Sequence, residues 1–454
     1  MPNRAIYAMG KICPALRNPI PDFEKTRGVH TFNRKAEAVM PANIRSIAII
    51  GGGPTGATLA TLLAKRGYQA AIFHSDKRPP LIVGESLLPA VVPMLRELGI
   101  EEEVKSFSVH KPGATVCLGL AEVITGGFIG AAGRLPPYAY NTPRDLFDQA
   151  VLSAAERAGA KVFHKSARLQ RGRKPDTVEL SAETLETAGG FFSGQPDLIV
   201  DASGRSRVIS KLLNSPAKKG GRNDVALFAH LDKSFMTDPG NIHLDHLTKG
   251  WAWRIPLPGR VSVGVVINPA HLEKYGDTIE RQYDAFLSQE PSMKFYTDGA
   301  KRLTPVIKYQ NYQLISEKMY GPGWVMAGDA AGFLDPIFST GLYLGMKGAF
   351  EIAKAIESGS PNAMQRYEKR LKWELRMWQR VIDSWYNGRL FNLYRAGQKL
   401  KNGLIGRRLS RRVQKRLLRI FSGQAVDDVY AMQLFEYLIS FGQVLRDPRD
   451  LVVE

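Results

Sequence analysis

A short apolar run followed at once by a glycine-rich turn constrains this chain more than any other feature. Residues 47–50 are apolar without alternation, which predicts a strand buried on both faces. The turn Gly51-Gly52-Gly53-Pro54-Thr55-Gly56 follows, and residues 58–65 then show the period of a helix that ends at Gly67. Strand, GxGxxG and helix in this order form the dinucleotide-binding fingerprint and predict a Rossmann-like α/β fold.

The residues of this turn have separate expected tasks. Gly51 allows the tight turn, Gly53 lets a pyrophosphate approach the backbone, and Gly56 lets the helix pack on the strand. Thr55 lies where phosphates would meet the free N–H groups of the first helical turn. The acid that should hold the ribose after the second strand, 69–73, is replaced by His74, and Asp76 is a weaker candidate for that task.

Composition excludes several classes of protein. The chain has 454 residues, room for two or three packed regions, and it contains no apolar run long enough to span a membrane. Cys13 and Cys117 lie far apart without a CxxC, which excludes a zinc ribbon or a disulfide framework and favours a reducing, cytoplasmic location. The net charge of +19 predicts an acidic partner or surface.

Residues 1–43 differ in character from the rest of the chain. They are polar, are interrupted by Pro19 and Pro21, and lack the apolar core of a signal peptide. Because Met40 stands just before the first strand, we expect residues 1–43 to be a disordered or mis-called extension and Met40 to be the natural start.

The remaining pattern predicts how the chain is organised. Residues 140–155 follow a helical period, 225–270 alternate as an antiparallel sheet does, and 342–356 form a helix. Beyond residue 360 the chain is helical, and one helix face is apolar. That face carries Leu371, Leu375, Trp378, Ile382 and Trp385.

Three separated motifs point to a flavoprotein. The turn at residues 51–56, Asp-Ala-Ser-Gly-Arg-Ser-Arg at 201–207 and Gly-Asp-Ala-Ala-Gly at 328–332 together resemble the FAD-dependent aromatic hydroxylase superfamily. The resemblance implies that Asp329 contacts the ribityl chain of FAD and that Arg144, in an RxxFD pattern, contacts FAD as well. It also implies an FAD-binding module over residues 44–360, an inserted antiparallel-sheet substrate region at about 206–315, and a helical basic region at 361–454.

Three further motifs make the chain similar to flavin-dependent halogenases. Residues 251–256, Trp-Ala-Trp-Arg-Ile-Pro, match the WxWxIP motif of that family, and Lys111 lies in the KxGA context of its essential lysine. Gly84-Glu85-Ser86 matches the GES loop that contacts the flavin in that family. Phe338 stands where tryptophan halogenases keep a glutamate, so the chain resembles members that act on phenols or pyrroles, including carrier-tethered ones.

The resemblance implies a reaction and a set of site residues. FADH2, supplied by a separate flavin reductase, gives a flavin hydroperoxide with O2, and chloride or bromide attacks it to form hypohalous acid. Thr340 and Gly341 would bind the halide at a helix N-terminus. Trp251 and Trp253 would separate flavin from substrate, Lys111 would relay the halogen, and Glu85 would be catalytic or tune the flavin.

Plain structural alternatives stay open for these residues. Lys111 could be a surface lysine, Glu85 a solvated loop acid, and the two tryptophans core residues. Two other functions also stay open: an FAD-dependent monooxygenase that hydroxylates an aromatic substrate, and a flavoprotein reductase of an isoprenoid lipid, whose family shares the GDAAG motif. The tryptophan motif and Lys111 favour the halogenase.

The C-terminal region carries a basic stretch. Between Asp383 and Asp427 there is no acid, whereas eleven lysines and arginines lie there around an apolar stripe of Leu409, Val413, Leu417 and Ile420. Such a helix can bind an acidic carrier protein or lie on an anionic membrane. No aromatic-stacking module is recognisable, so nucleic acid is not an expected partner.

Overall fold

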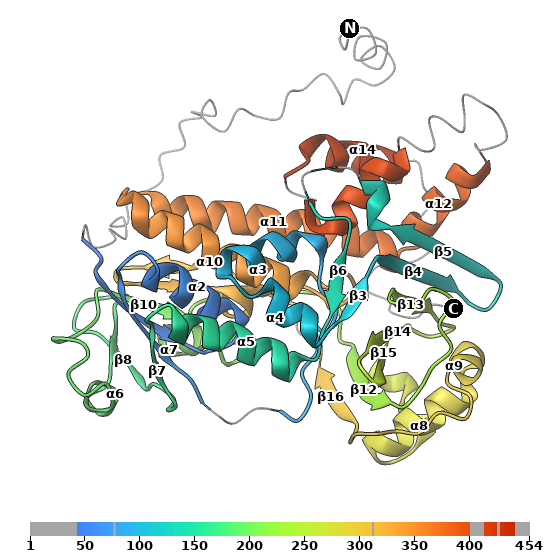
Figure 1. Ribbon diagram of the computed structural model, residues 1–454, viewed down its shortest axis with the longest axis horizontal. Coiled ribbons are helices and arrows are strands. Elements are labelled where there is room, and N and C mark those ends of the chain that lie inside the picture. Colours follow the sequence, from blue (N-terminus) through green and yellow to red (C-terminus); the bar gives the residue numbers. More distant parts are fainter. Residues whose placement is uncertain are drawn as a thin grey trace, which may run out of the picture. The chain divides into compact units, whose positions relative to one another are not determined.

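The computed structural model describes residues 43–75, 79–131, 133, 135–310, 313–399, 413–424 and 427–440, which Figure 1 shows in colour. All of these residues belong to one unit of the chain. Several residues singled out from the sequence lie outside them: residues 1–42, Asp76, Leu409 of the apolar stripe, and Lys401, Arg407, Arg408, Arg411 and Arg412 of the basic stretch.

A six-stranded sheet forms the base of the cofactor module. Its strands, in spatial order, are β18 (Tyr320–Gly321), β19 (Trp324–Met326), β10 (Leu198–Asp201), β1 (Ser46–Ile50), β2 (Gln69–Phe73) and β7 (Lys161–Phe163). All neighbours are parallel except β18 and β19. The central strand β1 is buried almost throughout, as its continuous apolar run predicted.

Three helices pack around the dinucleotide-binding turn. Helix α2 (Pro54–Ala64) contacts both α5 (Arg144–Arg157) and α10 (Thr340–Ser358). Residues 56–63 of α2 are all buried, which explains why its sequence is apolar and small on every side. The predicted start of α2 was four residues too late, because Pro54 is tolerated at the first helical position.

A second sheet has seven strands. In spatial order they are β16 (Ile307–Gln310), β12 (Val225–Leu231), β15 (Arg260–Ile267), β14 (Trp251–Leu257), β13 (Ile242–His246), β4 (Gly113–Leu118) and β5 (Glu122–Gly127). The sheet is not wholly antiparallel, because β13 pairs with β4 in parallel. Alternation reports which face a side chain occupies, and it is the same for both strand directions.

The two faces of this sheet have different neighbours. Trp251 and Trp253 belong to the large core that the sheet shares with the cofactor module. Ala252 and Val263 belong to a smaller core, which helices α8 (Ile279–Gln289) and α9 (Pro291–Tyr296) cover (Figure 1). Side chains at every second position therefore face the cofactor module, and this places both motif tryptophans on that side.

Residues 140–155 do not form one continuous helix. Strand β6 (Ala139–Asn141) pairs with β3 (Val109–Lys111), and α5 begins only at Arg144. The helical prediction failed at its start because Pro143 restrains Thr142 to an extended conformation and acts as the N-cap of α5.

Shorter elements lie outside the two larger sheets. They are α3 (Val92–Leu98), α4 (Glu101–Ser106), β8 (Leu169–Arg171), β9 (Val178–Leu180), α6 (Ala182–Thr187), α7 (Val208–Leu213), β11 (Ala217–Lys219), β17 (Leu314–Ser316) and β20 (Gly332–Phe333). Strands β11, β17 and β20 form a small separate sheet beside the loop that leads into α10.

Helices dominate the chain after α10. They are α11 (Ala363–Tyr386), α12 (Arg389–Lys399), a helical stretch at 413–419 that continues as a π-helix at Ile420–Gln424, and α14 (Val429–Ser440). The predicted apolar face of α11 is confirmed, since all five of its residues are buried. Among the described residues, no helix is both long and apolar enough to cross a membrane.

Candidate functional site

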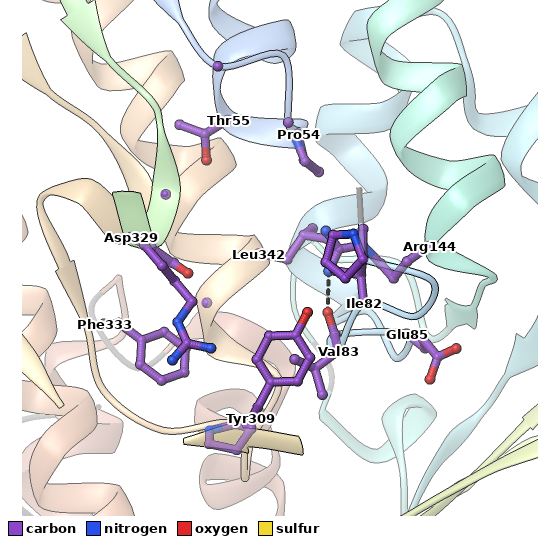
Figure 2. Close-up of a pocket in the computed structure, with 18 of the residues that line it drawn as sticks. Pro54, Thr55, Ile82, Val83, Glu85, Arg144, Tyr309, Asp329, Phe333 and Leu342 are labelled. Atoms are coloured by element: carbon purple, nitrogen blue, oxygen red, sulfur yellow. Dashed lines mark hydrogen bonds between the residues drawn. The ribbon is translucent and has the colours of Figure 1, made fainter. Parts of the chain in front are cut away.

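A cavity of about 570 Å³ opens where the parallel strands end. The residues directly after β1, β2, β10 and β19 all line it: Gly51, His74, Ala202 and Ala327. Ligands in open α/β sheets bind at this carboxyl edge. Figure 2 shows Thr55 and Asp329 on one side of the cavity and Arg144 and Glu85 on the other.

The glycine-rich turn has the geometry that its sequence predicts. Gly51 has φ +112°, and a Cβ there would lie 2.3 Å from the Ala202 carbonyl oxygen. A Cβ on Gly56 would lie 2.0 Å from the Gly51 oxygen. Gly53 has an ordinary φ of −69°, and no atom lies within 4 Å of a Cβ placed on it, so this side of the residue faces free space. Only Gly53 of these three leaves room for a ligand.

Where the glycine-rich turn lines the cavity, the site is suited to a dinucleotide. No side chain caps the N-terminus of α2, so its first N–H groups are available to a phosphate. His74 lines the cavity at the place where the ribose-binding acid was expected. The residues present therefore fit the phosphate end of FAD, while the ribose must be held without an acid at position 74.

Arg144 and Asp329, which the sequence predicts to contact FAD, both line the cavity. The Arg144 guanidinium donates to Asp148, at 2.9 Å from Nε, and to the Val83 carbonyl oxygen (Figure 2). Burial raises the pKa of Asp329 to about 6, against the opposing effect of Arg144. The ionised Asp329 carboxylate can accept a hydrogen bond from a polyol, and the protonated form, which predominates below about pH 6, can also donate one.

Glu85 and Ser86 reach the cavity from the opposite side and are both buried. The Glu85 carboxylate lies 2.7 Å from the His230 Nε2 atom on β12. Ser86 donates to the Asn141 side chain at 2.7 Å. Burial excludes the alternative of a solvated loop acid for Glu85, while its predicted catalytic or flavin-tuning role stays a prediction. Neither His230 nor Asn141 carried a sequence signal.

Trp251 and Trp253 line the same cavity as the glycine-rich turn. Their rings are 5.8 Å apart between centroids, and the residues are only 2% and 4% exposed. The Trp251 indole donates to the Tyr386 hydroxyl at 2.9 Å, and the Trp253 indole donates to the Ser262 hydroxyl at 3.2 Å. The two rings are therefore both core residues and cavity wall.

Lys111 is not among the residues that line this cavity. It ends strand β3 and is 2% exposed, which rules out an ordinary surface lysine. Its ammonium nitrogen donates to the Leu87 carbonyl oxygen at 2.8 Å and lies 5.4 Å from the centroid of the Phe128 ring. Burial lowers the pKa of Lys111 to about 7, so much of the amine is neutral near neutral pH.

The start of α10 holds the predicted halide residues. Gly341 lines the large cavity and also a smaller one, whereas Thr340 is buried and lines only the smaller cavity. Phe338 lines neither cavity and packs edge-on against Trp385, with centroids 5.8 Å apart, and against Phe421 at 5.2 Å. The structure thus brings Gly341 to the large cavity and Phe338 to an aromatic cluster formed with the C-terminal helices.

Comparison with known proteins shows which family the chain is similar to. A family model described as tryptophan halogenase matches residues 46–120 and 130–390. Tryptophan 2-halogenase of Chondromyces crocatus is 27% identical over 380 residues, which cover 79% of this chain and 72% of that protein. The 1H-pyrrole-2-carbonyl-(peptidyl-carrier protein) chlorinase of Pseudomonas fluorescens is 26% identical over 379 residues, 75% of this chain and 83% of that protein.

A solved structure has the same architecture. The myxobacterial chondrochloren halogenase CndH, described as a variant of the FAD-dependent halogenases, superposes with a TM-score of 0.67. It is 25% identical in sequence, and the superposition covers 90% of this chain and 97% of that one.

Proposed function

The chain belongs to the flavin-dependent halogenase family, and we therefore propose that it halogenates an electron-rich aromatic ring of the phenol or pyrrole type. The family uses FAD and a halide, and it needs a flavin reductase. When bound in this cavity, reduced FAD would supply two of the four electrons that reduce O2, and the halide would supply the other two. In sum, O2, FADH2, halide and one proton would become FAD, hypohalous acid and water.

One observation carries the proposal. A single cavity is lined both by the dinucleotide-binding turn and by Trp251 and Trp253 of the halogenase motif. Two buried indole rings at this place would exclude the substrate from the flavin, so that direct oxygen transfer to the ring would be blocked. The diffusing oxidant, hypohalous acid, is small enough to act on a substrate held elsewhere.

Lys111 fits the substrate side of such an arrangement. Its amine is buried and outside the flavin cavity, and it is largely neutral above pH 7. A neutral amine can take the halogen from hypohalous acid with release of water, and then pass it to an aromatic carbon, which loses a proton. A protonated amine would instead hydrogen-bond hypohalous acid and orient it.

The substrate class is supported by the surroundings of Phe338. The residue packs among Trp385 and Phe421, so this region offers apolar aromatic surface where tryptophan halogenases have a carboxylate. A relative that chlorinates a carrier-bound pyrrole makes a tethered acyl pyrrole a candidate substrate. The net charge of +19 would favour an acidic carrier protein.

The test is product mass. Purified protein would be supplied with FAD, a flavin reductase, NADH, and bromide or chloride, against phenols, free tryptophan, free pyrrole-2-carboxylate and the pyrrolyl carrier protein. We expect halide-dependent mass gain on a phenol or a pyrrole. A gain of one oxygen without halide would assign the protein to the hydroxylases, and halogenation of tryptophan alone would refute the substrate class.

Replacing Thr340 with valine should weaken halide binding. Valine keeps the shape and removes a hydroxyl, and a hydrogen bond to a charged group is typically worth about 1.5–3 kcal/mol. We therefore expect the KM for bromide to rise about 10-fold or more, with FAD affinity unchanged. Thr61→Val is the control, because the buried Thr61 hydroxyl donates within its own helix. Equal halide dependence in both variants would remove Thr340 from the site.

Replacing Glu85 with glutamine should slow turnover. The change keeps the side chain's shape beside His230 and removes its charge inside the flavin cavity. We expect kcat to fall roughly 10- to 100-fold, the range for losing a charged hydrogen-bond partner, while FAD still binds. Glu290→Gln is a matched control, since Glu290 is a buried acid that caps α9 outside the cavity. Similar rates for the two variants would make Glu85 merely structural.

A further inference from the structure

The indole of Trp251 is held from behind by a chain of hydrogen bonds. Its Nε1–H donates to the Tyr386 hydroxyl at 2.9 Å, and that hydroxyl lies 3.1 and 3.2 Å from the two Asp335 carboxylate oxygens, to which it donates. The backbone N–H of Ile337 donates to the same carboxylate at 3.0 Å. Trp251, Tyr386 and Asp335 are all at least 97% buried, so water does not compete for these bonds.

Arg222 supplies the countercharge for this chain. Its guanidinium lies 3.4 Å from Asp335 and stacks on the Tyr386 ring at 4.0 Å from the centroid. Asp383 is a second acidic neighbour, at 3.7 Å. Burial and the adjacent Asp335 raise the pKa of Tyr386 well above its ordinary value, so the phenol keeps its proton and stays a donor.

The four groups come from four distant parts of the fold. Trp251 opens strand β14, Asp335 lies between β20 and α10, Tyr386 is the last residue of α11, and Arg222 precedes β12. Trp251 and Asp335 line the flavin cavity, but Tyr386 and Arg222 do not. Helix α11 therefore contacts Trp251, a residue that lines the cavity, through Tyr386, which does not line it.

The second tryptophan has a different anchor. Trp253 donates to Ser262 on β15, the strand next to its own. Its orientation is thus set within one sheet, whereas the orientation of Trp251 depends on how α11 packs against that sheet. Contacts with α11 can therefore fix the orientation of the Trp251 ring but not that of the Trp253 ring.

We propose that Tyr386 and Asp335, with Arg222 as countercharge, are positioning residues that lock the Trp251 ring as a wall of the flavin cavity. The inference rests on the proposed function, in which this wall separates the oxidant from the substrate. With the lock intact, hypohalous acid leaves the flavin cavity toward the substrate. Without it, the ring tilts, and hypohalous acid escapes to solvent.

Tyr386→Phe is the direct test, because it removes one hydroxyl and keeps the ring that stacks on Arg222. We expect FAD affinity and O2 consumption to stay near wild type. Halogenated product per NADH consumed should fall about 10-fold or more, because the change removes both the bond from Trp251 and the stronger bond to the Asp335 carboxylate, and trapped free hypohalous acid should rise. Tyr367→Phe is the matched control, since Tyr367 lies on the same helix and its buried hydroxyl donates to the Met326 carbonyl oxygen at 2.9 Å.

A second readout reports on the ring itself. The chain has six tryptophans, so labelling with 5-fluorotryptophan gives a ¹⁹F spectrum in which Trp251 is assigned from Trp251→Phe. We expect its resonance to shift or broaden in Tyr386→Phe and to stay in place in Tyr367→Phe. If Tyr386→Phe does not fold, Asp335→Asn is the second variant, with the same expected loss of coupling and the same shift.

The outcomes distinguish the proposed positioning of Trp251 from the proposed halogenation reaction. Unchanged coupling in Tyr386→Phe, equal loss in Tyr367→Phe, or an unmoved Trp251 resonance would overturn the lock. Wild-type protein that yields neither halogenated product nor hypohalous acid would overturn the proposed function and the wall role with it. In that case a shifted Trp251 resonance would still show the hydrogen-bonded anchor, so the two failures are distinguishable.

Discussion

Replacing Lys111 with alanine is expected to abolish halogenation and leave the flavin chemistry running. The amine lies outside the FAD cavity, so FAD binding, O2 consumption and release of peroxide or hypohalous acid should continue. Halogenated product should fall about 100-fold or more, as it does when a positioned catalytic group is lost. Product mass and trapped hypohalous acid, measured on the same sample, give both quantities.

Two further variants distinguish the positive charge of Lys111 from the reactivity of its amine. Lys111→Arg keeps a cation but is bulkier and does not become neutral, so it should fail as well. Lys111→Met keeps the length of the side chain without the amine. Because it also removes the donor to the Leu87 carbonyl oxygen, at a cost of about 1–3 kcal/mol, thermal unfolding is measured alongside. Undiminished halogenation in Lys111→Ala or Lys111→Met would show that the Lys111 amine does not transfer the halogen.

The pH dependence of this step has a definite sign. Burial lowers the pKa of Lys111 to about 7, so the fraction of neutral amine rises as pH increases through that value. If the neutral amine carries the halogen, coupling of oxidation to product should increase from about pH 6 to about pH 8 and then level off. A decrease over the same interval would favour the protonated amine as a hydrogen-bond donor to hypohalous acid.

Replacing Gly53 with leucine is expected to abolish FAD binding without unfolding the protein. The backbone at Gly53 has φ −69°, which any residue can adopt, and no atom lies within 4 Å of a Cβ placed there. The leucine side chain would instead fill the space meant for the pyrophosphate. We expect FAD affinity to fall by about 100-fold or more, because steric exclusion also removes the charge-assisted phosphate contacts.

Gly194→Leu is the matched control for this variant. Gly194 also has open space at its Cβ and no positive φ, but it is exposed and does not line the cavity. Fluorescence titration with FAD and thermal unfolding, run on both variants, separate binding from stability. Normal FAD binding by Gly53→Leu would contradict the assignment of the turn. Gly51 and Gly56 are less informative positions, since a Cβ at either would collide with backbone.

Local signals in the sequence predicted the cofactor module well. The apolar run of β1, the turn and helix α2 lie within about twenty residues, and their geometry depends on contacts inside that stretch. The apolar face of α11 is confirmed for the same reason, because a period of 3.6 residues directly reports one buried side. Errors arose at element ends, where Pro54 extended α2 and Pro143 delayed α5.

Contacts between distant residues were decided by the tertiary structure alone. Glu85 meets His230 across 145 positions, and Trp251 meets Tyr386 across 135. Periodicity shows that a side chain is buried but does not show which element covers it, and the parallel pairing of β13 with β4 was missed for this reason. By itself, the sequence determined the cofactor turn and the motif tryptophans. Packing decided which side chains hold those tryptophans in place and that Lys111 is buried away from the flavin cavity, because both depend on how separate elements meet.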